Sequence, residues 1–282
     1  MVNLKDIQTQ SIYAVEQAAI FVQRELGKIG QADIETKSLN SLVTYVDKES
    51  EKILVTELQK IMPNASFLTE EHTVAPSQGE WKWIIDPLDG TTNFIHQIPS
   101  FGISVGLQHN EQMVVGVVKE VNRNELFYAT KNQGAFLNGT SIQVTATAKL
   151  SDSLIATGFP YYDFDSMQAY LQTLAHLMTN TRGIRRLGAA AIDLCYVACG
   201  RFDAFFEYSL SPWDVAAGAL IVQEAGGVVA DFKGGDNWLT GRQIMASNKY
   251  VAAPMLELLR EKFLGNKSKR LPFWIAVKIV NS

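Results

Sequence analysis

The stretch WIIDPLDGTTNF, residues 83–94, joins an apolar run to two closely spaced aspartates. Its first residues, 83–85, predict a buried strand with Asp86 at the polar end of that strand. Pro87 is expected to stop the hydrogen-bond ladder there. Asp89 follows after one turn's worth of chain. Two carboxylates this close repel each other unless a cation lies between or beside them. The stretch therefore predicts a strand that ends at a cation site.

The residues directly after Asp89 predict the start of a short helix. The N–H groups of Gly90, Thr91 and Thr92 would lack partners within the helix, and the positive end of its dipole would suit a phosphate oxygen. Read alone, Asp-Gly-Thr also fits an ordinary turn in which Thr91 caps the helix. Read with the acids before it, the segment favours a cation site next to an anion site.

Two other segments place acids at the end of an apolar run. Glu70 and Glu71 follow the run FLT, and taken alone they are typical of a solvated loop. Asp47 follows the run LVTYV, and taken alone it fits the N-cap of a helix over 47–62. These acids become informative only together with the segment around Asp86.

In a third segment, SPWDVAAG at residues 211–218, an acid opens an apolar helix. Ser211 fits the N-cap, Pro212 the first helical position and Asp214 the acid of a capping box. The start of a helix is also a natural place from which to aim a carboxylate into a cleft. The structural and the functional interpretation of Asp214 are therefore compatible.

The hydrophobic pattern changes near residue 150. Helices are expected first, then an antiparallel meander with an Asn-Gly hairpin at 138–139, and afterwards strands that alternate with helices. We expect an N-terminal α+β half (1–150) with most cation ligands, a C-terminal α/β half (151–265) and a tail (266–282) of unknown role. The expected elements are helices 3–27 and 47–62, the meander 81–144, strand 154–157, helices 165–179 and 188–199, strand 204–206, helix 212–225, strands 228–232 and 243–247, and helix 254–264.

The composition is that of a globular protein with ample material for a core. The 282 residues are 47% hydrophobic, and the formal net charge of −4 attracts neither nucleic acid nor an anionic membrane. The first residues are polar where a signal peptide would be apolar, and no run approaches the ~20 apolar residues of a membrane span. We therefore expect a cytoplasmic protein that does not bind membranes. The arginines 182, 185 and 186 are expected to be solvated or at an interface rather than to bind RNA.

The cysteines and histidines restrict the kind of metal that the chain can hold. Cys195 and Cys199 are the only cysteines, so a disulfide framework is excluded and both are expected to be buried packing residues. The four histidines are scattered, with no close pair. Any metal is therefore held by oxygen, which indicates a hard cation rather than zinc.

Taken together, these segments resemble the inositol monophosphatase family. The resemblance covers roughly residues 5–264 and rests on four segments in order. They are the Val-Thr-x-x-Asp segment (43–47), the acidic pair (70–71), the string DPLDGTTNF (86–94) and the helix WDVAAG (213–218), which ends in EAGG (224–227). The resemblance implies a layered α/β/α/β/α sandwich, usually a homodimer, with magnesium ions in a cleft between the halves.

The resemblance also implies a role for each matching residue at two or three Mg²⁺ ions. Glu70, Asp86 and the backbone carbonyl of Leu88 would bind the first ion, and Asp86, Asp89 and Asp214 the second. Thr91 and Asp47, together with Glu70, would position and activate the attacking water. Backbone N–H groups of Gly90, Thr91 and Thr92 would hold the phosphate. Inhibition by lithium, which would occupy the second metal site, is a further implication.

The substrate side is implied in the same way. Glu207 resembles the family's hydroxyl-binding glutamate, Gly188, Ala189 and Ala190 resemble a segment that lines the polyol pocket, and Asp89 would also contact a hydroxyl. The retained Thr92-Asn93 pair favours a monophosphorylated polyol, with myo-inositol monophosphate as the expected substrate. The alternatives are fructose bisphosphate, NADP, histidinol phosphate, an adenosine bisphosphate, or a non-catalytic regulatory module that kept the fold. The presence of both Asp47 and Thr91 argues against the last, because a binding module has no need to activate water.

Overall fold

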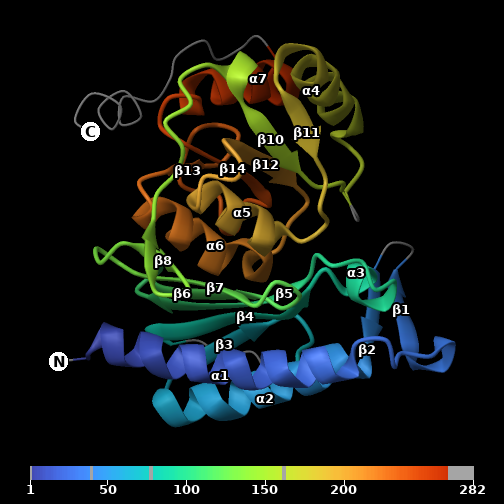
Figure 1. Ribbon diagram of the computed structural model, residues 1–282, viewed down its shortest axis with the longest axis vertical. Helices are drawn as coiled ribbons and strands as arrows, with labels where there is room; N and C mark the ends of the chain where they lie inside the picture. Colours follow the sequence, from blue (N-terminus) through green and yellow to red (C-terminus); the bar gives the residue numbers. More distant parts are fainter. Residues whose placement is uncertain (1, 39–40, 76–78, 161–162, 266–282) are drawn as a thin grey trace.

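The chain folds into five layers that alternate between helices and sheets (Figure 1). The structure is a computed structural model that describes residues 2–38, 41–75, 79–160 and 163–265, so the tail at 266–282 lies outside the described residues. The layers are, in order, helices α1 (Leu4–Glu25) and α2 (Tyr45–Ile61), a seven-stranded sheet, helices α5 (Ala190–Ala198) and α6 (Pro212–Glu224), a five-stranded sheet, and helices α4 (Met167–Asn180) and α7 (Ala252–Leu264). This order confirms the expected α/β/α/β/α sandwich.

Helix α1 forms where its apolar stripe and its end signals predict it. The side chain of Asn3 caps its start by accepting hydrogen bonds from the N–H groups of the first turn. The stripe that contains Ala14, Ala18 and Val22 is fully buried against the seven-stranded sheet and α2. The helix ends before Gly27, whose φ of +78° is the left-handed conformation that favours glycine.

Helix α2 begins two residues earlier than expected, and its cap is not Asp47. Thr44 is the N-cap, because its Oγ1 accepts a hydrogen bond from the N–H of Val46 at 3.1 Å. Asp47 is the third helical residue, and its Oδ2 accepts the N–H of Thr44 at 2.8 Å. The N-cap interpretation of Asp47 was therefore wrong, and only one of its carboxylate oxygens serves the helix.

The seven-stranded sheet has the order β3-β4-β5-β6-β7-β8-β9. Strand β3 runs parallel to β4, and every later neighbour is antiparallel, so the predicted meander is confirmed. The strands are β3 (Ser66–Thr69), β4 (Trp81–Asp89), β5 (Gly102–His109), β6 (Gln112–Glu120), β7 (Glu125–Thr130), β8 (Ala135–Leu137) and β9 (Thr140–Ile142).

Strand β4 continues past Pro87, where the sequence predicts its end. Its pairing with β5 shifts register between Asp86, which lies opposite Ser104, and Asp89, which lies opposite Gly102. Two residues of β4 thus face one residue of β5, which is a β-bulge. Pro87 interrupts the ladder without ending the strand, and both aspartates stay at its end.

The five-stranded sheet is mixed and has the order β11-β10-β12-β14-β13. Strand β11 and a separate hairpin of β1 and β2 were not predicted, because these strands are short and carry many polar residues. The strands of this sheet are β10 (Leu154–Thr157), β11 (Gly183–Arg185), β12 (Ala204–Tyr208), β13 (Val228–Ala230) and β14 (Gln243–Ser247). The separate hairpin consists of β1 (Ile34–Ser38) and β2 (Ser41–Thr44). Two short 3-10 helices cover Gln31–Asp33 and Leu150–Asp152.

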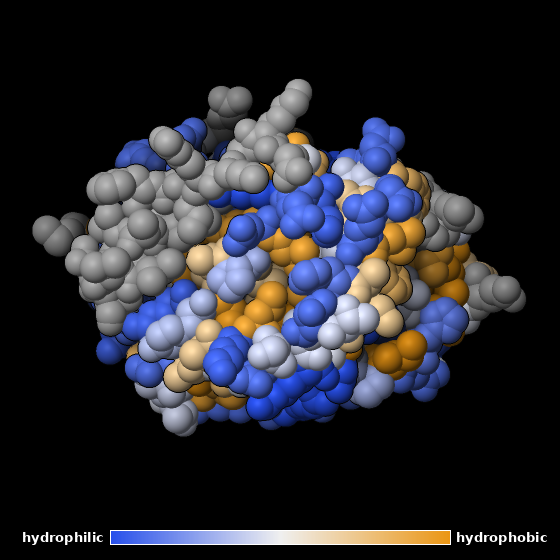
Figure 2. All heavy atoms as spheres, turned by 90° about the horizontal axis from the view of Figure 1, so that it is seen from above, coloured by the Kyte–Doolittle hydropathy of each residue, from blue (hydrophilic) through white to orange (hydrophobic). Residues whose placement is uncertain are grey.

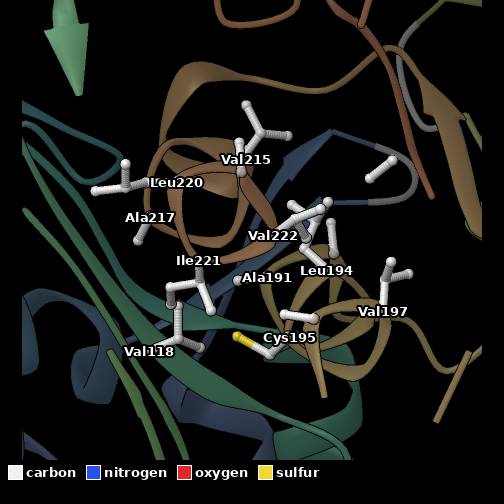
Figure 3. Packing of buried hydrophobic residues seen from close by; sticks show 14 of the residues in the cluster. Val118, Ala191, Leu194, Cys195, Val197, Val215, Ala217, Leu220, Ile221 and Val222 are labelled. Carbon is white, nitrogen blue, oxygen red and sulfur yellow. The ribbon is translucent and has the colours of Figure 1, made fainter. Parts of the chain in front are cut away.

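Helices α5 and α6 form the central layer and pack closely against each other (Figure 3). A Cβ atom on Gly218 of α6 would lie only 2.7 Å from the Cβ of Leu194 on α5, so the close approach of the two helices requires glycine. Cys195 is fully buried in this layer, as expected, whereas Cys199 is only partly buried. The prediction of two buried cysteines was thus half right.

The outer face over α4 and α7 shows hydrophobic residues among hydrophilic ones (Figure 2). Leu171 and Met178 of α4 are exposed apolar side chains seven positions apart, so they share one face of the helix. None of the helices in the described ranges is both long enough and apolar enough to cross a membrane.

Candidate active site

Two of the predicted acids meet at one edge of the seven-stranded sheet. Strands β3 and β4 are parallel neighbours with Thr69 opposite Ile85, and the N–H of Glu70 donates to the carbonyl oxygen of Ile85 at 3.3 Å. Glu70 follows β3 directly, and Asp86 is the next residue of β4. Parallel pairing therefore places both acids side by side, although the sequence separates them by a loop.

Gly90 turns the chain from β4 into the short helix α3 (Thr91–Ile95). Its φ is +90°, and a Cβ atom there would lie 2.9 Å from the carbonyl oxygen of Ser100. Both the conformation and the lack of space require glycine. The turn brings the hydroxyl and N–H groups of Thr91 next to the acids of β4.

The Thr91 hydroxyl lies between two acceptors, Asp47 Oδ1 at 2.8 Å and the Leu88 carbonyl oxygen at 3.0 Å. Asp47 is buried, and its other oxygen is held by the start of α2. Burial raises the pKa of Asp47, and its hydrogen bonds with Thr44 and Thr91 oppose that shift. A hydroxyl that donates its single hydrogen to Asp47 still has lone pairs with which to accept a hydrogen bond from water.

Asp214 enters the site from the first turn of α6. Its Oδ2 accepts the N–H of Ser211 at 2.6 Å, as in the expected capping box. The helix is also tied to the sheet, because Ser104 of β5 donates its hydroxyl to the carbonyl oxygen of Trp213 at 3.3 Å. The capping role and the aim of Asp214 into the cavity thus coexist.

These residues surround a cavity of about 130 Å³ between the two sheets. Every predicted site residue lines it except Asp47, which lies behind Thr91 and contacts it through the hydroxyl. Glu207 enters from β12, and Gly188, Ala189 and Ala190 enter from the segment that leads into α5. The structure therefore brings together, in one place, residues from both sides of the predicted active site.

Asp89 connects the two sides of this cavity. Its Oδ2 accepts the N–H of Ala191 at 2.7 Å, at the start of α5. The first N–H groups of a helix lack intrahelical partners, and its positive end favours a carboxylate. Asp89 therefore fixes the start of α5 relative to β4.

Burial and mutual repulsion govern the acids of the site. Burial raises the pKa of Asp86 well above its usual range, and the nearby carboxylates add to the shift. Burial also raises the pKa of Asp89 to about 7, although the hydrogen bond from the N–H of Ala191 opposes this shift. Burial likewise raises the pKa of Asp214 to about 7, and the negative charge of Asp89 adds to that shift. In the absence of a cation, these acids disfavour their ionised forms.

The donor set fits a hard divalent cation. The cavity offers the carboxylates of Glu70, Asp86, Asp89 and Asp214 and the Leu88 backbone, and oxygen ligands of this kind are those that Mg²⁺ prefers. In the described part of the chain, no group of three or more acid, histidine or cysteine side chains already converges on one point as a metal site. Oxygens of Asp86, Asp89 and Asp214 accept backbone N–H groups instead. The residues present fit the ion chemically, and binding would draw their carboxylates inward.

Several residues near the cavity were not predicted to belong to the site, among them Arg186, Gly158 and Glu51. Arg186 was expected to be solvated or at an interface, but it lines the cavity, and its guanidinium lies 5.0 Å from the ring centroid of Phe159. Gly158 also lines it. Glu51 lies behind the Glu70 loop and holds it. The sequence offered little signal for any of them, because each reaches the site only through the packing of distant segments.

The match to known proteins covers almost the whole chain. The model of the inositol monophosphatase family matches residues 3–264. The chain belongs to this family. An inositol-1-monophosphatase of Rhizobium meliloti is 40% identical over 250 residues, which are 88% of this chain and 94% of the relative.

Two further relatives of this chain carry a different name. A putative Nus factor SuhB of Neisseria meningitidis serogroup B is 43% identical over 247 residues, which are 87% of this chain and 95% of the relative. The crystal structure of the extragenic suppressor protein SuhB from Bartonella henselae superposes with a TM-score of 0.86 at 37% identity, covering 91% of this chain and 99% of that one. The family and its fold are therefore shared by proteins named for two kinds of function.

Proposed function

We propose that the protein is a magnesium-dependent phosphatase that hydrolyses the phosphate monoester of a small polyol, with myo-inositol monophosphate as its substrate. The observation that carries this proposal is the Thr91–Asp47 hydrogen bond at the wall of a cavity lined by five acids. A protein that only bound an anion would need no such pair beside the phosphate position. Membership of the inositol monophosphatase family supports the same activity.

The residues divide into ion-holding and water-positioning groups. Glu70, Asp86, the Leu88 carbonyl, Asp89 and Asp214 would hold two or three Mg²⁺ ions, which when bound neutralise the phosphate and stabilise the attacking and leaving oxygens. Asp47 orients the Thr91 hydroxyl, whose oxygen accepts a hydrogen bond from the attacking water, with Glu70 beside it. The N–H groups of Gly90, Thr91 and Thr92 hold phosphate oxygens. The water oxygen bonds to phosphorus as the bond to the polyol oxygen breaks. The water gives a proton to Thr91 Oγ1 as the Thr91 proton passes to Asp47, the polyol oxygen takes up a proton from solvent, and free polyol and inorganic phosphate are released.

The polyol occupies the other side of the cavity in this proposal. The carboxyl of Glu207 and the backbone of Gly188, Ala189 and Ala190 face the space next to the phosphate position and contact the hydroxyl groups. Asp89, which already holds the start of α5, contacts a further hydroxyl. The alternative substrates carry the same phosphate monoester on a different molecule, and they are fructose bisphosphate, NADP, histidinol phosphate and an adenosine bisphosphate. A substrate panel distinguishes among them.

The deciding experiment is phosphate release by the purified protein from inositol-1-phosphate, from the alternative substrates and from an aryl phosphate. Chelator should abolish the release, and added Mg²⁺ should restore it. Millimolar Li⁺ should inhibit uncompetitively if it occupies the second metal site. Full activity in chelator would refute the metal dependence, whereas insensitivity to Li⁺ would count only against that detail of the site.

A second function is supported by the names of relatives that are about as similar as the phosphatases. We infer from the Nus factor name of the Neisseria meningitidis relative that this chain also has a Nus factor role. The test is complementation of a bacterial strain that lacks its own SuhB, with the wild-type chain and with Thr91→Ala. Equal complementation by both would separate this role from catalysis, and failure of both would refute it.

The family resemblance also implies a homodimer, which we propose for this chain. The exposed apolar pair Leu171 and Met178 on the outer face of α4 is compatible with a covered surface. The mass of the protein in solution, measured by light scattering, tests the proposal directly.

A further inference from the structure

The carboxyl group of Glu207 lies directly against the backbone of Gly158. A Cβ atom built on Gly158 would lie 2.1 Å from both carboxyl oxygens of Glu207 and 2.2 Å from its carboxyl carbon. Real atoms do not approach this closely, so any side chain at position 158 would displace the carboxyl. The φ of Gly158 is not positive, and therefore the backbone conformation itself would accept another residue. Space for Glu207, not backbone freedom, is what requires glycine here.

The sheet explains why these two residues meet. Strands β10 and β12 are parallel neighbours, and Thr157 at the end of β10 is paired with Phe206. Gly158 is the residue after Thr157, and Glu207 is the residue after Phe206, so the two lie side by side. Side chains of neighbouring residues in register point to the same face of a sheet. A side chain at 158 would therefore point into the space that Glu207 fills.

The backbone at this contact is tied down, so it has no easy way to move. The hydroxyl of Tyr170, which is buried, donates to the carbonyl oxygen of Gly158 at 2.7 Å. The hydroxyl of Thr157 donates to the carbonyl oxygen of Phe206 at 2.8 Å, which ties the end of β10 to the strand that carries Glu207. Glu207 is itself 5% exposed. An added methyl group would thus push the carboxyl out of its place rather than shift the backbone.

We propose that Gly158 is a specificity-determining residue: its missing side chain fixes the position from which the Glu207 carboxyl contacts a polyol hydroxyl. The inference rests on the proposed function, in which Glu207 faces the polyol. Both residues line the cavity, so a displaced carboxyl changes the polyol side of the cavity. The groups that hold the phosphate and the ions lie on other elements and keep their positions.

The test is a double-mutant cycle with Gly158→Ala, Glu207→Ala and the double variant, each assayed on inositol-1-phosphate and on an aryl phosphate. Gly158→Ala should raise KM for inositol-1-phosphate about tenfold more than KM for the aryl phosphate, the size expected for one lost hydrogen bond to a buried charged group. In the Glu207→Ala background, Gly158→Ala should change the ratio of the two KM values little further, because the carboxyl is already absent. Equal effects on both substrates, or a full additional loss in the double variant, would overturn the proposal.

The free energy of unfolding gives a readout that does not depend on activity. Gly158→Ala should destabilise the wild-type protein clearly more than it destabilises Glu207→Ala, and this coupling tests the contact alone. If Gly158→Ala does not fold, Gly158→Ala combined with Glu207→Asp should, because the shorter acid leaves room for the methyl group. Failure of that combination overturns the contact. A protein that shows the coupling but hydrolyses neither substrate would refute the proposed function and, with it, the specificity role.

Discussion

The hydroxyl of Thr91 donates to the carboxylate of Asp47 at 2.8 Å, although the two residues are 44 positions apart in the chain. Asp47 is held by the first turn of α2 and Thr91 by the Gly90 turn after β4, so the bond joins the outer helix layer to the cavity. The same carboxylate uses its second oxygen to stabilise its own helix. The pair is therefore fixed before any substrate binds.

Replacing Thr91 with alanine removes the hydroxyl and keeps the backbone N–H. We expect kcat to fall ~10²–10⁴-fold, as for the loss of general acid–base assistance, while KM and the Mg²⁺ requirement change little. Steady-state kinetics at several Mg²⁺ concentrations measure this. Asp89→Asn should instead weaken Mg²⁺ binding and activity together, because it removes a ligand charge.

Thr91→Ser is the matched control, since it keeps the hydroxyl and loses only a methyl group. It should retain activity within a few-fold of the wild-type protein. The N-cap of α3 is Gly90, so Thr91 is not the cap that the sequence alone also allowed. If the Thr91 hydroxyl only ties its turn to Asp47 and Leu88, Thr91→Ala would cost ~1 kcal/mol of stability and keep its turnover. A stable Thr91→Ala protein with near-normal kcat would contradict the water-positioning role.

Glu51 holds the loop that carries Glu70. This fully buried side chain of α2 accepts the N–H groups of Glu71 and Thr73, each at 2.7 Å, and also the Thr73 hydroxyl. Glu51→Gln would turn an NH₂ group toward these donors and loosen the loop. We expect the Mg²⁺ concentration for half-maximal activity to rise ~10-fold, with a smaller loss of kcat at saturating Mg²⁺.

A Mg²⁺ titration of activity checks the Glu51 prediction, and a calorimetric Mg²⁺ titration checks it without substrate. Thr73→Ala removes only the hydroxyl contact and should give a shift in the same direction but smaller. An unchanged Mg²⁺ dependence in folded Glu51→Gln would show that the loop keeps its position without this carboxylate.

Local sequence patterns predicted most of the layers. The apolar stripe of α1, the turn at Asn138-Gly139 and the apolar run before Asp86 each act over a few residues, and their elements lie where they were expected. Asp86 and Asp89 were predicted to form a cation site for the same reason, because their repulsion depends on their short separation. The assignment of roles to Glu70 and Asp214 came from the family resemblance.

Long-range pairing explains what the sequence did not predict. The contact between Gly158 and Glu207 depends on the register of two parallel strands. That register cannot be inferred from the residues near either position. Glu51 stands in the polar run KESEK and looks like a solvated helix position, but it is buried because the Glu70 loop folds over it. Asp47 was misplaced as a cap because Thr44, three residues earlier, offers the same kind of side-chain oxygen.

The raised pKa values of Asp89 and Asp214 predict how the metal-free protein responds to pH. Both are about 7 in the folded chain, against an ordinary value of 3.8. Between pH ~4 and 7 the folded form keeps protons that the unfolded form has lost, so stability falls as pH rises, by up to ~1.4 kcal/mol per pH unit and group. Well above pH 7 both groups are ionised in the folded and the unfolded form, so they no longer change the stability as pH rises.

Thermal unfolding in chelator and in Mg²⁺ at pH 5, 6, 7 and 8 measures this effect. Mg²⁺ favours the ionised carboxylates, so it should raise the melting temperature more at pH 8 than at pH 5. Asp214→Asn in chelator should show a flatter loss of stability between pH 5 and 7 than the wild-type protein. Identical slopes for the two proteins would contradict the assignment.

Asn93 joins helix α3 to the segment that leads into α5. Its Nδ2 donates to the carbonyl oxygens of Ser100 at 2.7 Å and Leu187 at 2.9 Å, and the side chain is buried. Asn93→Asp keeps the shape but replaces the donor with an acceptor that faces two carbonyl oxygens. We expect it to destabilise the protein at pH 7 by ~2–4 kcal/mol, more than Asn93→Ala does. Denaturant unfolding of the three proteins measures the difference.

Protonation provides an internal control for the Asn93 prediction. In Asn93→Asp, the introduced carboxyl can donate one hydrogen bond once it is protonated, so the stability gap between this variant and Asn93→Ala should narrow as the pH falls toward 5. Because the bond to Leu187 holds the segment that leads to Gly188, both variants should also lose more kcat/KM for inositol-1-phosphate than for an aryl phosphate. Equal losses on the two substrates, with no narrowing of the gap at low pH, would leave Asn93 as an ordinary buried amide with no part in aligning the two sides of the cavity.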